Sequence, residues 1–498
     1  MRVARLNQLN TFLIQLNETI MVFNDDTGMY IEVPSNCIKN ASKGSVSTLI
    51  IDEEAYVCKP FVKIFDVMQD IKANSNIAGV NEPTPREYMK IVGVSGFSEL
   101  ILETTTACNM RCRYCLFSGE YYGFRTHGIE KMSEEIAKKA LDMYFTLIEE
   151  YKYLNPLREP KIGFYGGEPL LNFELIKFSV EYSRKLFNKY NVEYTLTTNG
   201  TILSNEIASF LIENNFKVFI SLDGPREEHD RNRVFADGKG SFDVVMGNIK
   251  RYNELARRLG REAFLYALAT YDIKTDLIKL REFFNKVVDE IKLVFITSVR
   301  PFDTEYYSKF SDDELKEFLE REKYLEEEFL EYLKKGLWKH ERGIFLDVYF
   351  GQRVILTLLG AKVSRSVSNL LPYGKPCLPP YRIYVTVNGN LLPCEKSPNN
   401  LTIGNVHSGI DYSAIIKIIS KYQEFQSSHC VSCPIKYSCQ SCLAIISPTT
   451  LRDCKSKCNI FKKMTERDIK LTAFAIKEDP YYILHLLHNL KEVGLYLM

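Results

Sequence analysis

The sequence of 498 residues predicts an α/β protein. Its centre is a partial (β/α)6 TIM-like barrel, flanked by a small N-terminal α+β domain and a C-terminal cysteine-rich domain. Between residues 98 and 297, six short apolar segments alternate with amphipathic helices, which is typical of parallel strands joined by right-handed βα units. Six units are fewer than the eight of a closed barrel, so we expect an open one. Eight of the 13 cysteines follow the barrel, between Cys377 and Cys458.

Residues 1–95 are predicted to form the small α+β domain. TFLIQL and IMVF are strand-like, DDTG is a turn, and MYIEV is a further strand, so a β-meander is expected. The segment FVKIFDVMQDI that follows has the apolar period of a helix.

Residues 96–305 predict the barrel. Its strand segments are SELILETT, KIGFYG, VEYTLTT, KVFISLDG, FLYALAT and IKLVFIT. The helices between them span residues 133–150, 172–190, 204–214, 241–259 and 275–287. Ser133 and Ser204 are suited to cap two of these helices, because each is followed by Glu two residues later.

Residues 306–370 are predicted to form a helical linker. In it, residues 311–336 form one long charged helix that we expect to be solvated.

Residues 371–465 are predicted to form the cysteine-rich domain. There RIYVTVNGNLLPC alternates around an Asn-Gly pair, a strong hairpin signal that places Cys394 at the end of the second strand. Residues 466–498 predict a C-terminal helical segment.

Composition excludes several classes of protein. The chain has 64 Lys and Arg residues against 63 Asp and Glu residues, which gives a net charge of +1. This charge creates no overall electrostatic field that would attract nucleic acid or anionic membranes. No stretch approaches the ~20 apolar residues of a transmembrane helix, and the N-terminus lacks the apolar region of a secretory signal. We therefore expect a cytoplasmic protein. In that compartment, 13 cysteines indicate metal binding or catalysis rather than disulfides.

Cys108, Cys112 and Cys115 form a CxxxCxxC group directly after the first barrel strand. Loops at the carboxyl ends of barrel strands carry the chemistry in such folds. Three thiolates can hold three irons of a [4Fe-4S] cluster and leave the fourth iron open for a chelating substrate. Two alternatives are a structural zinc site, with His127 as a distant fourth ligand, or three buried apolar cysteines.

The motifs in this order resemble the radical S-adenosylmethionine (SAM) superfamily. Tyr114 precedes the last cysteine of the trio, GGEP follows the second strand, TTNGT ends the third, and SLDGP and HDRNR follow the fourth. The resemblance implies that GGEP binds the amine of SAM, and that Ser221 and Arg233 bind its carboxylate. The residues that it assigns to SAM binding are Tyr114, Gly166, Gly167, Glu168, Pro169, Asn199, Ser221, Asp223 and Arg233. His229, in contrast, is expected to be a surface or packing residue.

The C-terminal cysteines taken alone suit zinc, because CxxC repeats after five residues. After the radical SAM motifs, residues 371–465 resemble instead the SPASM extension, which carries two auxiliary [4Fe-4S] clusters. Leu371 stands where the first ligand usually lies, and a CxxC replaces the usual CxxxC, so Cys454 is the candidate replacement ligand. The resulting hypothesis assigns four cysteines to each cluster: Cys377, Cys394, Cys442 and Cys454 to one, and Cys430, Cys433, Cys439 and Cys458 to the other.

Three further residues received roles. Cys37 and Cys58 are expected to be structural, since free cysteine is commonly a small buried apolar residue. Glu395 directly follows Cys394, and in sulfatase-maturing members of this group an acidic residue there acts as a base. A solvated hairpin charge is the alternative for Glu395.

The resemblance implies an enzyme that cleaves SAM reductively and removes a hydrogen atom from a peptide or protein. The segment LFSGEYYGFRTHG, with Tyr121, Tyr122, Arg125 and His127, is more similar to the peptide maturases that crosslink ribosomally made precursors than to the sulfatase maturases. The leading expectation is thus a thioether or carbon crosslink. Formation of formylglycine from Cys or Ser is the alternative, and a non-enzymatic zinc-binding protein a further one. Expected partners are a leader-bearing precursor, which residues 1–95 could bind by strand addition, and a small electron-donor protein.

Overall fold

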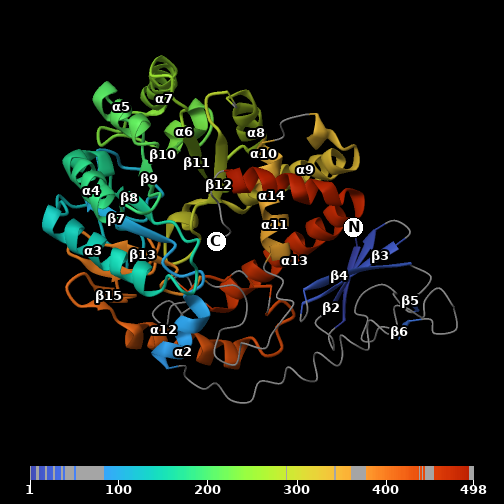
Figure 1. The fold of residues 1–498 in the computed structure, drawn as a ribbon. Helices are drawn as coiled ribbons and strands as arrows, with labels where there is room; N and C mark the ends of the chain where they lie inside the picture. Colours follow the sequence, from blue (N-terminus) through green and yellow to red (C-terminus); the bar gives the residue numbers. More distant parts are fainter. Residues whose placement is uncertain are drawn as a thin grey trace.

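A computed structural model of the chain gives the fold shown in Figure 1. It describes residues 2–6, 11–16, 19–25, 28–34, 38–39, 50–51, 84–287, 289–340, 344–359, 377–436, 438–439, 441–443 and 454–492. Cys37, Cys58, Leu371 and the segment FVKIFDVMQDI lie outside these residues, so the predictions made for them stay predictions.

Six parallel strands form the barrel, as predicted. They are β7 (Glu99–Thr105), β8 (Lys161–Gly166), β9 (Glu193–Thr198), β10 (Lys217–Ser221), β11 (Leu265–Tyr271) and β12 (Leu293–Ser298), in the order β12-β11-β10-β9-β8-β7. All seven side chains of β7 are buried, including the charged Glu99 and Glu103, so this strand is covered on both faces.

Helices follow the strands on the outside of this sheet (Figure 1). They are α3 (Glu134–Glu150), α4 (Phe173–Leu186), α5 (Asn205–Glu213), α7 (Phe242–Arg258) and α8 (Leu277–Lys286). Ser133 and Ser204 cap α3 and α5 as predicted, because each hydroxyl accepts a hydrogen bond from the backbone N–H three residues on. The short helix α6 (Arg226–Asn232), between β10 and α7, was not predicted.

The C-terminal hairpin extends the barrel sheet, which the sequence did not predict. β13 (Arg382–Val385) pairs in parallel with β7, and β14 (Asn390–Leu392) returns antiparallel around Gly389, whose φ of 81° suits glycine. The short strands β15 (Gly404–Asn405) and β16 (Gly409–Ile410) follow. β15 pairs with β14 and β16 pairs with β15, which completes a ten-stranded sheet. The hairpin that carries Cys394 therefore lies beside the strand that leads into the cysteine trio.

The N-terminal strands form the predicted meander. β1 (Arg2–Leu6), β2 (Thr11–Leu16), β3 (Thr19–Asn24) and β4 (Met29–Pro34) are antiparallel neighbours in that order, and a separate pair joins β5 (Ile38–Lys39) and β6 (Ile50–Ile51). Figure 1 shows this sheet beside α13 (Cys454–Glu478), a helix from the C-terminal part of the sequence. The next helix, α2 (Pro85–Val92), packs into the barrel core through Tyr88 and Met89.

The linker helix α9 (Asp312–Lys334) lies within the predicted residues 311–336 but is less solvated than predicted. It buries Phe318, Leu325, Phe329, Tyr332 and Leu333, so that one face of this charged helix joins the main core. A short α10 (Ile344–Leu346), a π-helical turn (Asp347–Gly351) and α11 (Gln352–Leu359) follow.

Helix α13 runs across the predicted boundary at residues 465 and 466, and α14 (Pro480–Glu492) follows it. The predicted cysteine-rich domain and C-terminal helical segment therefore share this continuous helix. None of the helices in the described residues is long and apolar enough to cross a membrane.

Candidate functional site

The cysteine trio lies in the loop after β7, at the carboxyl end of the barrel sheet. Cys108, Cys112 and Cys115 are half-buried, and backbone N–H groups of Met110 and Phe117 donate to Cys108 Sγ and Cys115 Sγ at 3.4 Å each. Burial raises the pKa of Cys108 to about 11 and that of Cys115 to about 12. N–H donors to cysteine sulfur are among the features that tune iron–sulfur clusters.

Gly166 and Gly167 hold the second strand against this loop. The Gly167 N–H donates to Thr105 O at 2.9 Å, and the Glu168 N–H to Ala107 O at 2.8 Å. A Cβ on Gly167 would lie 2.1 Å from Ala107 O, and Gly166 has a φ of 144° that L-residues rarely adopt. Both glycines are therefore required by the close approach of the two backbones.

Glu168 links the GGEP motif to the third strand. Its fully buried carboxylate accepts hydrogen bonds from Thr198 Oγ1 and the Asn199 N–H at 2.7 Å each, and from the Leu170 N–H at 3.1 Å. Burial raises the pKa of Glu168 to about 7 despite these bonds. Asn199 in turn donates to Asn109 Oδ1 at 2.8 Å, within the trio loop. Pro169 begins the short helix that follows.

Tyr114, Asp223 and Arg233 form a buried chain behind the trio. The Tyr114 hydroxyl donates to Asp223 Oδ2 at 2.5 Å and accepts from Arg233 Nη1 at 2.7 Å. Burial raises the pKa of Asp223, and the charge of Arg233 opposes that shift. Arg233 Nε is buried without a hydrogen-bond partner. Ser221, the last residue of β10, is half-buried close by in sequence.

His229 is a buried packing residue. Its Nδ1 accepts from the Asp223 N–H at 3.3 Å, so Nε2 carries the proton and donates to Ser241 Oγ at 2.9 Å. Burial, followed by the charge of Arg233, lowers the pKa of His229 well below its usual value. The imidazole therefore connects the end of β10 to the start of α7 in its neutral form.

This burial predicts a loss of stability in acid. The unfolded chain binds a proton at His229 below about pH 6.5 and the native chain does not, so stability falls by up to about 1.4 kcal/mol for each pH unit below that value. We expect the His229→Gln variant to show a smaller decrease between pH 7 and 5.5 in urea unfolding. The exposed variant His407→Gln is the control, and equal slopes for His229→Gln and the parent protein would contradict the prediction.

Arg125 is half-buried and pairs with the buried Glu103, a residue that the sequence analysis did not single out. Arg125 Nε pairs with Glu103 Oε1, and Glu103 also accepts from the Tyr384 hydroxyl at 2.9 Å and the Val387 N–H at 3.1 Å. The guanidinium stacks on Phe117 at 3.5 Å, so it is fixed beside the trio. A charged residue within the apolar strand ELILETT was the signal that could have identified Glu103.

The structure brings Cys442 into electrostatic range of Cys377 and Cys394. Burial raises the pKa of Cys394 to about 12, and the negative charge of Glu395 adds to the shift. Glu395 Oε1 lies 3.7 Å from Arg382 Nη1, while its Oε2 is buried without a partner. Burial raises the pKa of Tyr165, and the charges of Glu395 and Cys115 raise it further, whereas the charge of Arg125 lowers it. Glu395 is therefore not a solvated hairpin charge.

Cys433, Cys439 and Cys458 form a second neighbourhood. The charges of Cys433 and Cys458 both raise the pKa of Cys439, after the larger effect of burial. Cys430 and Cys458 are both half-buried and pack against the main core. Cys454 is the first residue of α13, and its side chain lies outside the described residues. Cys377, Cys394 and Cys442 thus lie in one electrostatic neighbourhood, and Cys433, Cys439 and Cys458 lie in another, whereas the assignment of Cys430 and Cys454 stays a hypothesis.

The donor set of the trio fits a [4Fe-4S] cluster and SAM. The three thiols lie in one loop, and backbone N–H groups donate to two of the sulfurs. The backbone of Gly167 lies directly against this loop at Ala107. Arg233 Nε is a buried donor without a hydrogen-bond partner. His127 Nε2 comes within 3.7 Å of Cys115 Sγ. Among the described residues, however, no three His, Cys, Asp or Glu side chains converge to hold a single metal ion. A cluster differs in this respect, because its cysteines bind separate irons.

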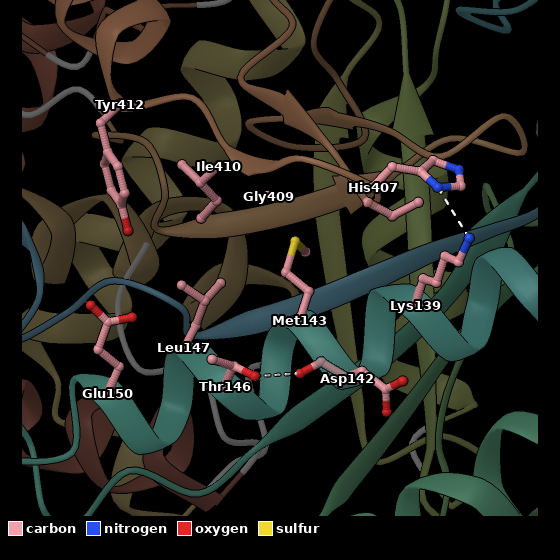
Figure 2. Close-up of a pocket in the computed structure, with 11 residues that line it drawn as sticks. Lys139, Asp142, Met143, Thr146, Leu147, Glu150, His407, Gly409, Ile410 and Tyr412 are labelled. Carbon is pink, nitrogen blue, oxygen red and sulfur yellow. Dashed lines mark hydrogen bonds between the residues drawn. The ribbon is translucent and has the colours of Figure 1, made fainter.

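A separate groove is lined by other residues (Figure 2). It has a volume of about 550 Å³ and lies between α3 and residues 406–412, where Lys139 Nζ approaches His407 Nδ1 at 3.1 Å. None of the residues that the sequence motifs single out lines this groove, so the candidate site is the barrel interior.

Comparison with known proteins supports the same assignment. A sequence model of the Radical SAM superfamily matches residues 102–266, which include the trio, GGEP, Asn199 and Asp223. The cysteine-type anaerobic sulfatase-maturating enzyme of Clostridium novyi (strain NT) is 34% identical over 206 residues, which are 39% of this chain and 49% of that protein. The radical SAM cyclopropyl synthase TigE of Paramaledivibacter caminithermalis is 24% identical over 248 residues, 48% of this chain and 49% of TigE.

The chain spans about half the length of these curated relatives. Among solved structures, native anSMEcpe with bound AdoMet and Cp18Cys peptide matches with a TM-score of 0.51 at 21% identity, over 75% of this chain and 98% of that one. This likeness shows a common fold. Residues 102–266 therefore form a domain of the Radical SAM superfamily, and the cofactors of this domain are SAM and a [4Fe-4S] cluster.

Proposed function

We propose that this protein oxidises a single residue of a peptide or protein substrate, and that formylglycine formation from Cys or Ser is its leading reaction. The observation that carries the proposal is the position of Glu395. Its buried Oε2 has no partner, and Tyr165 lies within electrostatic range of both Glu395 and Cys115. A proton acceptor and the cysteine trio are thus near the same interior tyrosine. The sulfatase-maturating relatives favour this reaction over a crosslink.

When bound, the reduced cluster and SAM supply a 5′-deoxyadenosyl radical that removes a hydrogen atom from carbon. The chain has to orient both SAM and the substrate and to move a proton. The GGEP turn would bind the amine of SAM, and Ser221 and Arg233 its carboxylate. Glu395 would accept the thiol or hydroxyl proton of the substrate as its carbon is oxidised. The C-terminal cysteines would hold two auxiliary clusters that accept the remaining electron, as in the SPASM extension.

A crosslinking peptide maturase is the second candidate. TigE, a radical SAM cyclopropyl synthase, matches 48% of this chain, and the loop after the trio favours the same class. That loop is anchored on both sides, because the Tyr122 N–H donates to Asp303 O and the Asn399 N–H to Gly123 O, at 2.9 Å each. The proposal includes a leader-bearing precursor and a small electron-donor protein. The leader would add to edge strand β1 or β4 of the N-terminal sheet.

Anaerobic reconstitution tests the proposal. Iron, sulfide and zinc per chain are measured together with 5′-deoxyadenosine release under a reductant. About twelve irons with deoxyadenosine would support three [4Fe-4S] clusters. Zinc alone, with no deoxyadenosine, would contradict the proposal and favour the zinc-binding alternative.

Synthetic peptides with one Cys, or with Ser in its place, are then incubated with the enzyme and weighed by mass spectrometry. Loss of sulfur from the Cys peptide and loss of two hydrogens from the Ser peptide indicate formylglycine. Loss of two hydrogens with sulfur retained indicates a thioether. Deoxyadenosine release without either product would contradict action on these peptides.

The ligand hypothesis predicts that Cys454→Ala removes iron. If Cys454 replaces the ligand missing at Leu371, its loss leaves one cluster with three cysteines, and we expect about four fewer irons per chain. Cys58→Ala, at a position expected to be structural, is the matched control and should keep all its iron. Unchanged iron and sulfide in Cys454→Ala would show that another group completes the cluster.

A further inference from the structure

The N-terminal sheet packs against the second cysteine neighbourhood. Phe12, Ile14 and Leu16 of β2 and Met21 and Phe23 of β3 share one apolar cluster with Ile435, between two cysteines, and with Ile469 and Ala473 of α13. The half-buried Cys433 and Cys439 pack against the same cluster. Residues from the two ends of the chain thus form one core around these thiols.

A buried hydrogen bond ties the sheet to the cysteine loop. Asp25 follows β3, and its Oδ1 accepts from the Ser438 N–H at 2.9 Å. Asp25 is 2% exposed and Ser438 is 6% exposed, so water cannot readily replace this acceptor. Ser438 directly precedes Cys439, and the bond therefore acts on the backbone that positions this thiol.

Lys477 fastens the sheet at a second point. It extends from α13, and its Nζ donates to the carbonyl oxygen of Leu16, the last residue of β2, at 3.2 Å and to Oγ1 of Thr19, the first residue of β3. The same ammonium pairs with Glu32 of β4 at 3.2 Å. Apolar packing, the Asp25 bond and Lys477 together hold the sheet in place beside Cys433 and Cys439.

We propose that the N-terminal sheet is a wall of the second auxiliary cluster, holding the loop between Cys433 and Cys439 in its ligating geometry and excluding solvent from it. This inference rests on the proposed function, because it takes this group of cysteines to hold a [4Fe-4S] cluster. Solvent exposure and hydrogen bonding around the sulfurs govern the potential and stability of such clusters. The sheet therefore belongs functionally to the cysteine-rich domain, although some 400 residues separate them.

The test uses the full chain with Cys108, Cys112 and Cys115 replaced by Ala, so that only the C-terminal clusters remain. This background should hold about eight irons. Asp25→Ala removes the acceptor of the Ser438 N–H, and we expect it either to hold about four irons or to release half of its iron to bathophenanthroline at least tenfold faster. Asp25→Asn retains an oxygen acceptor and should behave like the background. Met29→Leu, at an exposed position of β4, is the surface control on the same sheet.

Two further variants make each outcome decisive. Cys439→Ala should lose the second cluster. If it loses no iron, both the inference and the assignment of an auxiliary cluster to this group fail. If it loses about four irons while Asp25→Ala keeps its iron with unchanged release, the inference alone is overturned. Should Asp25→Ala fail to fold, Lys477→Ala decides, because it loosens the sheet without touching the cysteine loop. Unchanged iron release in Lys477→Ala would then overturn the inference.

Discussion

Gly167→Ala should lower the rate of 5′-deoxyadenosine formation by at least about 100-fold, since a misplacement of about 1 Å can cost that much. The added Cβ would lie 2.1 Å from Ala107 O and 2.5 Å from Ala107 C, which are backbone atoms that cannot rotate away. Ala107 directly precedes Cys108, and Glu168 N–H donates to the same carbonyl at 2.8 Å. Relief of the clash therefore moves a cysteine of the trio or the GGEP turn.

Gly247→Ala provides the matched control for this substitution. Gly247 lies within α7, and a Cβ there meets no atom within 4 Å. Alanine is favoured over glycine inside a helix by about 0.5–1 kcal/mol, so this variant should be slightly more stable and fully active. Deoxyadenosine formation under a reductant is measured with iron per chain and thermal stability. A Gly167→Ala enzyme with a normal rate would show that the backbone contact is not required.

Glu395→Gln should abolish conversion of the peptide substrate while 5′-deoxyadenosine still forms. General-base catalysis contributes about 10²- to 10⁴-fold, and glutamine cannot accept the substrate proton. Glutamine keeps the size of the side chain and an oxygen toward Arg382, which lies 3.7 Å from Glu395 Oε1. We therefore expect product formation to fall by that factor, with iron content and SAM cleavage within about threefold of the parent enzyme.

Glu99→Gln separates this role from a general effect on Arg382. Glu99 Oε2 lies 3.2 Å from Arg382 Nε, so the two carboxylates share one guanidinium. Glu99 Oε1 also accepts from Thr195 Oγ1 at 2.9 Å, which leaves this residue in a structural network. The control should lose stability but keep its ratio of product to deoxyadenosine. Equal ratios in Glu395→Gln and the parent enzyme would remove Glu395 from the mechanism.

Periodicity and motif spacing predicted the barrel and the chemistry at the ends of its strands. Each βα unit is local, because a short apolar strand and the amphipathic helix after it specify one another within about 30 residues. The parallel order of the strands then follows from right-handed connections. Cys108, Asn199 and Asp223 were assigned from strand-end motifs, and the structure links their loops through Asn109, Tyr114 and Arg233.

Contacts between distant segments were not predictable in the same way. The Arg125–Glu103–Tyr384 network joins residues up to 281 apart, and no local pattern records such a pairing. The addition of β13 to β7 likewise depends on strand edges that only the folded barrel exposes. The burial of α9 was underestimated because its charged residues mask a single apolar stripe that includes Leu325 and Phe329.

The sequence by itself determined the class of this protein, because cofactor chemistry depends on residue types at short spacings within one loop or one strand end. The tertiary structure alone decided which distant residues act together. It placed Glu395 near Tyr165 through the added hairpin, and it set Asp25 of the N-terminal sheet against Ser438. Such pairings arise from the joint burial of apolar faces that are far apart in the chain, and those faces become neighbours only when the core assembles.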